Sequence, residues 1–151
     1  MTSTQILWSL HLLGAVIWVA GIVFLMAMLR PSRSVLEVPA RLLMNPTIHR
    51  QLFRVVWRAA PIVLATGYAL LFGAYGGYTA LSWKVTLSHI PGLLMSAGFL
   101  AIYLGPFRSV SAAFAAGDLK AGAAAMSRLR QLALLNLFLG ILTIVLATFG
   151  G

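Results

Sequence analysis

Long apolar runs separated by shorter polar stretches dominate the hydrophobic pattern of the chain. The runs cover about residues 6–29, 53–75, 81–103 and 132–149. Each is close to the roughly 20 residues that a helix needs to cross a hydrocarbon core of about 30 Å. A segment in lipid must satisfy its own backbone hydrogen bonds, so each run is expected to be helical. The pattern therefore predicts the all-α fold of an integral-membrane, antiparallel four-helix bundle, with residues 1–151 in one domain.

The polar stretches predict different connections. Residues 31–49 contain three prolines and predict a loop, with one short surface helix near residues 36–44. The second connection is short and rich in glycine. Residues 109–130 are rich in alanine and predict helices that extend beyond the membrane, with Gly117 and Gly122 at the turn between them.

Composition and charge agree with a lipid environment and orient the bundle. The chain is 61% hydrophobic and 9% charged, and it has 11 Lys and Arg against 2 acidic residues. The basic residues cluster between the apolar runs, which favours membrane topology over nucleic-acid binding. Most of them fall in the first and third connections, so the positive-inside rule places both termini outside. We therefore expect a multi-pass protein of the bacterial inner (cytoplasmic) membrane.

The same composition excludes several kinds of chemistry. The chain has no cysteine, which excludes disulfides, thiolate metal sites and covalent attachment of haem. Its only acidic residues are Glu37 and Asp118, both in polar connections. Paired-carboxylate catalysis and a carboxylate-rich di-iron bundle are therefore poor interpretations.

Two histidines within the apolar runs are the main candidates for function. His11 and His89 each precede a glycine by three residues, Gly14 and Gly92. An ionisable side chain at membrane depth is costly, so such a residue is a functional candidate. Both histidines are expected about 8–12 Å below the outer surface, on parallel helices that lie diagonally in the bundle.

This placement predicts a shared ligand, a haem b whose iron is held by His11 and His89. The diagonal of such a bundle is roughly 12–14 Å, which suits two imidazoles on one iron. Gly14 and Gly92 would leave room for the porphyrin face, and Lys84 is the basic residue nearest the expected propionates. Two alternatives remain. The histidines could hydrogen-bond between helices without a cofactor, or they could bind copper, although no methionine cluster lies at their depth.

The other polar residues have simpler interpretations. His49 is expected at the membrane interface, Asn136 and Thr143 in hydrogen bonds within the bundle, and Trp18 in the core. Three arginines one turn apart at the start of the second run are expected to anchor in anionic headgroups: Arg50, Arg54 and Arg58.

The first run carries a family resemblance. The stretch from His11 to Gly21, HLLGAVIWVAG, resembles the opening helix of the CopD-like copper-resistance membrane proteins. It is also similar to the HemJ protoporphyrinogen oxidases, in which a histidine leads a Trp-x-x-Gly stretch. Lys84, after Trp83, resembles the lysine that begins the corresponding HemJ helix, and Arg128 with Asn136 resembles the Arg…Asn pattern entering its last span.

Each resemblance implies a different activity. HemJ implies b-type haem and oxidation of a porphyrinogen, whereas CopD-like proteins imply copper handling. His89 and Pro91 are not part of the HemJ pattern, and Leu137 stands where an acidic residue is expected after the asparagine. These departures favour a simple bis-histidine haem carrier.

The leading hypothesis is a membrane b-type cytochrome that transfers electrons, because a six-coordinate iron has no open position. The alternatives are a HemJ-like oxidase with His11 and Lys84 in its site, a copper transporter, and an assembly subunit with no cofactor. The lipid bilayer is the expected partner. Whether a redox protein or a quinone exchanges the electrons, and whether the chain forms a homo-oligomer, stays open.

Overall fold

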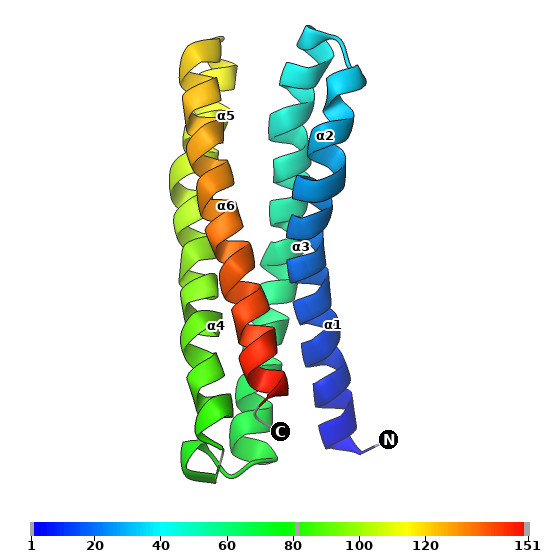
Figure 1. Cartoon of the computed structure of the whole chain (residues 1–151), viewed down its shortest axis with the longest axis vertical. Helices are drawn as coiled ribbons and strands as arrows, with labels where there is room; N and C mark the ends of the chain where they lie inside the picture. Colours follow the sequence, from blue (N-terminus) through cyan, green and yellow to red (C-terminus); the bar gives the residue numbers. More distant parts are fainter. Residues whose placement is uncertain (1, 81, 150–151) are drawn as a thin grey trace.

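The computed structural model describes residues 2–80 and 82–149, without the side chains of Arg33, residues 38–45, Ala80 and Lys84. Its regular elements are all helical within these ranges (Figure 1). Four of the helical segments are long and apolar enough to cross a membrane: Ser3–Ser32, Pro46–Gly73, Val85–Ala115 and Leu119–Thr148. The expected all-α four-helix membrane bundle is therefore confirmed.

The first span begins with α1 (Ser3–Val23), which starts at a capping box. The Thr2 hydroxyl accepts from the main-chain N–H of Gln5, and the side-chain oxygen of Gln5 accepts from the main-chain N–H of Thr2. It continues through a π-helical segment, η1 (Phe24–Leu29), into α2 (Arg30–Ser32) and the 3₁₀ turn η2 (Arg33–Val35). A π-helical turn is wider than an α-helical one and shifts the direction of the residues that follow it.

The second span, α3 (Val38–Gly73), is longer than the sequence predicts. The short helix expected near residues 36–44 is the start of α3, which begins at Val38. The loop expected after it is wrong, because α3 runs without a break through Pro46 and Pro61. Pro39 lies in the first turn, where the missing amide hydrogen costs nothing.

The 3₁₀ turn η3 (Tyr78–Ala80) leads to the third span, which consists of α4 (Trp83–Ile102), the π-helical η4 (Tyr103–Phe107) and α5 (Arg108–Ala115). The hydroxyl of Ser82 caps α4 at the Val85 amide. Pro91 is inside α4.

The fourth span, α6 (Leu119–Thr148), starts after a tight turn. Gly117 has a φ of +71°, which favours glycine, and the Asp118 carboxylate accepts from the Ala121 amide. The predicted helical extension and the turn at Gly117 agree with this arrangement. Gly122 is not in the turn; it is buried in α6, where an added Cβ would lie 3.2 Å from the Phe114 ring.

The helices pack as two close pairs, α1 with α3 and α4 with α6, and α1 also contacts α6. Glycines permit the close approach within the pairs, as is common between membrane helices. Larger aromatic side chains join the pairs. The Phe99 ring lies 5.7 Å from the rings of both Trp18 and Phe53. The two ends of the chain lie at the same end of the bundle (Figure 1). His11 is in the first half of α1 and His89 is in the second turn of α4, whereas Arg30 is at the far end of the first span.

Candidate functional site

His11 is fixed in position by α3. Its Nδ1 lies 3.0 Å from the main-chain oxygen of Val63 and 3.3 Å from the hydroxyl of Thr66. A carbonyl oxygen can only accept, so Nδ1 carries the hydrogen and donates it. In a neutral ring this leaves Nε2 with its lone pair. The half-buried imidazole is thus held in one tautomer by the neighbouring helix.

The surface of α3 has a notch that accepts the His11 ring. Gly67 lies directly beneath it, and a Cβ at that position would be 3.0 Å from Cε1 of His11. The Thr66 hydroxyl bonds back to the main-chain oxygen of Ile62 at 2.5 Å, which fixes its direction. The Trp8 ring contacts the His11 ring edge to face, with the ring centres 6.1 Å apart. Nε1 of Trp8 in turn donates a hydrogen bond to the Tyr75 hydroxyl at 3.1 Å.

His89 is held in an equivalent way by its own helix. Its Nδ1 lies 3.1 Å from the main-chain oxygen of Val85, which again requires Nδ1 to be the donor. The Tyr78 ring contacts the imidazole edge to face, with the ring centres 5.4 Å apart. Partial desolvation, followed by a hydrogen bond with Tyr68, raises the pKa of Tyr78 above its ordinary value, so this phenol stays protonated at neutral pH.

The structure therefore places the two histidines at one end of the bundle, and in each ring Nδ1 is the nitrogen that forms a hydrogen bond. The imidazoles are close enough to interact electrostatically. Among the described residues, no group hydrogen-bonds to Nε2 of either ring. A histidine that ligates a metal has this arrangement, in which one nitrogen donates to a carbonyl and the other is free to coordinate.

The two glycines that follow the histidines each face a neighbouring helix. An added Cβ at Gly14 would lie 2.7 Å from Cγ2 of Val63, so α3 fills the space beside it. An added Cβ at Gly92 would lie 3.5 Å from the Thr143 side chain on α6. Both glycines therefore face the partner helix of their own pair, and the clearance for a porphyrin that the sequence predicts stays a prediction. The Lys84 side chain lies outside the described part of the structure.

Other contacts of the site could not be read from the sequence. Val63, Thr66 and Gly67 carry no chemical signature of their own, and only the packing of α3 on α1 brings them to His11. The sequence suggests that Tyr78 is one of the aromatic residues that gather at membrane interfaces. Its contact with His89, however, depends on how the connection between α3 and α4 folds.

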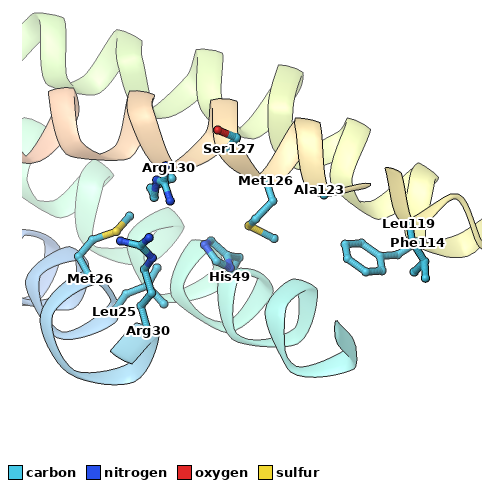
Figure 2. Close-up of a pocket in the computed structure, with 10 residues that line it drawn as sticks. All are labelled: Leu25, Met26, Arg30, His49, Phe114, Leu119, Ala123, Met126, Ser127 and Arg130. Atoms are coloured by element: carbon cyan, nitrogen blue, oxygen red, sulfur yellow. The ribbon is translucent and has the colours of Figure 1, made fainter. Parts of the chain in front are cut away.

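A second polar region lies at the opposite end of the bundle. His49 is at this end, and the interfacial position predicted for it stays a prediction. Only 5% of the residue is exposed, and it lines two cavities. The larger cavity has a volume of about 260 Å³ and includes Arg30 and Arg130 (Figure 2). Neither of these two cavities is lined by His11 or His89.

The smaller cavity contains unpaired polar atoms. Nε1 of Trp18 and Oδ1 of Asn136 are buried without a hydrogen-bond partner, and both residues line it. Trp18 is in the core as expected. Asn136 is buried, but its oxygen faces Gly98, where an added Cβ would lie 2.7 Å away. Thr143 bonds to the main-chain oxygen of Leu139 in its own helix.

Within the described ranges, no group of three or more His, Asp or Glu side chains could hold a metal ion. Comparisons with protein-family models, with curated proteins and with solved structures give no match to this chain.

Proposed function

We propose that the chain is an integral-membrane b-type cytochrome in which His11 and His89 are the two axial ligands of one haem. The observation that carries the proposal is that the two imidazoles have the same tautomer. Each Nδ1 donates to a main-chain carbonyl, and each Nε2 keeps its lone pair in a half-buried, apolar setting. A pair of neutral imidazoles is the donor set of a low-spin haem b.

The residues around the rings have defined roles in this proposal. The Val63 and Val85 carbonyls hold the tautomer of each histidine and increase its basicity as a ligand. Gly67 lets the His11 ring lie against α3. Lys84 is proposed to receive the propionates near the outer surface. When bound, the six-coordinate haem supplies one-electron transfer with a redox protein or a quinone.

The alternatives of copper handling and porphyrinogen oxidation have less support. Soft copper favours methionine and cysteine ligands. The chain has no cysteine, and the hydrogen-bond and ring partners of the two histidines in the described structure include no methionine. We retain membership of a CopD-like or HemJ-like group, and the bacterial inner membrane with both termini outside, as parts of the proposal.

The test is an optical one on the full chain, purified in detergent after expression with sufficient haem. We expect a reduced-minus-oxidised difference spectrum with sharp low-spin bands. His11→Ala and His89→Ala should each abolish these bands or convert them to high-spin. The chain's third histidine provides the matched control, because His49→Gln alters a buried histidine at the opposite end.

Several results would reject the proposal. A colourless protein would exclude a haem, and an unchanged spectrum in His89→Ala would exclude the ligand pair. If the purified chain carries copper that only the His11 and His89 variants lose, the copper alternative replaces the cytochrome. Porphyrinogen turnover that Lys84→Ala abolishes would favour the oxidase.

A further inference from the structure

The larger cavity is a separate candidate site, at the end of the bundle away from His11 and His89. Its walls come from the end of the first span, from α3, from α5 and from α6. Arg30 follows directly after the π-helical turn η1, a kind of turn that often occurs at functional sites. His49 comes from α3 and Arg130 from α6.

The polar groups of this cavity converge. In Figure 2 the guanidinium of Arg30 points toward that of Arg130, and the His49 imidazole lies beside them. Arg30 is exposed, Arg130 is half-buried and His49 is almost wholly buried. Among the described residues that line the cavity, none carries a carboxylate. Two like charges that approach each other repel, and an anion between them would be attracted to both.

Apart from Ser127, the remaining lining is apolar. Leu25, Met26, Phe114 and Met126 surround the charged groups, and methionine adapts to irregular apolar shapes. A small inorganic anion would use only the arginines. An anion attached to a hydrocarbon chain would use both kinds of surface.

The position of the cavity selects between these ligands. It opens where the apolar spans Ser3–Ser32 and Leu119–Thr148 meet the polar connections, at the level expected for lipid headgroups. The exposed arginines Arg50, Arg54 and Arg58 lie at the same end of α3 and attract anionic headgroups to that surface.

We propose that this cavity binds the phosphate of an anionic phospholipid. Arg30 and Arg130 hold the phosphate oxygens, His49 donates a further hydrogen bond, and the glyceride part lies over Met126 and Leu25. The shared chemistry is a phosphate group, and the apolar lining distinguishes the lipid from free phosphate. This inference does not depend on the haem.

The experiment is native mass spectrometry of the full chain in detergent, with phosphatidic acid or phosphatidylcholine of the same acyl chains. The wild type is expected to retain a single phosphatidic acid in preference to phosphatidylcholine. Arg130→Gln should lower that retention by about tenfold, the usual effect of losing one charge-assisted hydrogen bond. Arg128→Gln is the matched control, because Arg128 is exposed on the same helix and does not line the cavity.

A second variant keeps the proposal testable if Arg130→Gln does not fold. Ala123 is an exposed lining residue, and Ala123→Glu places a carboxylate beside the arginines with little cost to the helix. It should reduce retention as strongly as Arg130→Gln. Equal losses in Arg128→Gln and Arg130→Gln, or full retention in Ala123→Glu, would overturn the proposal. Displacement of the lipid by inorganic phosphate at the same concentration would also overturn it, because the apolar lining would then contribute nothing.

Discussion

The ring of His11 and the missing side chain of Gly67 occupy adjoining space, since a Cβ on residue 67 would lie 3.0 Å from Cε1 of His11. An alanine at 67 would push the ring by a few tenths of an ångström, and the Nδ1 bond to Val63 would lengthen or tilt. The direction of Nε2 would change with it. Gly67 is therefore a positioning residue for the proposed ligand.

Gly67→Ala is expected to alter haem binding while the protein still folds. Replacing glycine by alanine favours a helix by roughly 0.5–1 kcal/mol, so the fold should not be lost. Haem retention should instead fall by about tenfold, and the low-spin bands should weaken with it. Gly73→Ala is the matched control on α3, because an added Cβ there meets no atom within 4 Å. If both variants retain haem equally, the notch at Gly67 has no part in positioning His11.

Gly14→Ala and Gly92→Ala separate helix packing from cofactor clearance. The first should destabilise the protein by about 1–3 kcal/mol, because the added methyl overlaps Val63. The second should leave stability nearly unchanged, since its methyl would make an ordinary contact with Thr143. Thermal unfolding in detergent, in the absence and presence of haem, provides the measurement. A large haem-dependent loss at Gly92 would support its predicted role in porphyrin clearance.

Asn136→Leu is expected to be neutral or to stabilise the fold by about 1 kcal/mol. The Oδ1 atom of Asn136 is buried without a partner, so its removal relieves a desolvation cost. Thr143→Val serves as the control, because the Thr143 hydroxyl has a partner in Leu139. If Asn136→Leu instead lowers the free energy of unfolding by more than about 2 kcal/mol, the asparagine has a polar partner, such as a water bridging to Trp18.

The absence of cysteine makes the topology directly measurable. Single cysteines at Thr2 and Thr79, both exposed, should react in intact cells with a reagent that does not cross the membrane. Cysteines at the exposed positions Ser34 and Ala116 should react only after the membrane is opened. The reverse pattern would invert the orientation given by the basic residues.

The sequence by itself determined the lipid environment, the four apolar spans and the candidacy of the two histidines. Span length, the scarcity of charge and the cost of an ionisable ring in hydrocarbon are properties of the chain that need no neighbour. The turn at Gly117, with Asp118 starting α6, could also be placed because its signal is local.

The tertiary structure alone decided what surrounds these residues. Periodicity identifies the face of a helix but not the helix opposite, so the contacts of Gly14 with Val63 and of Gly92 with Thr143 could not be predicted. The helix expected near residues 36–44 was not joined to the second span, because Pro46 between them is a local signal for a break that α3 does not contain. Similarly, His49 became a buried lining residue beside Arg30 and Arg130 only through the pairing of distant segments. Such contacts join residues far apart in the chain, and no local pattern records them.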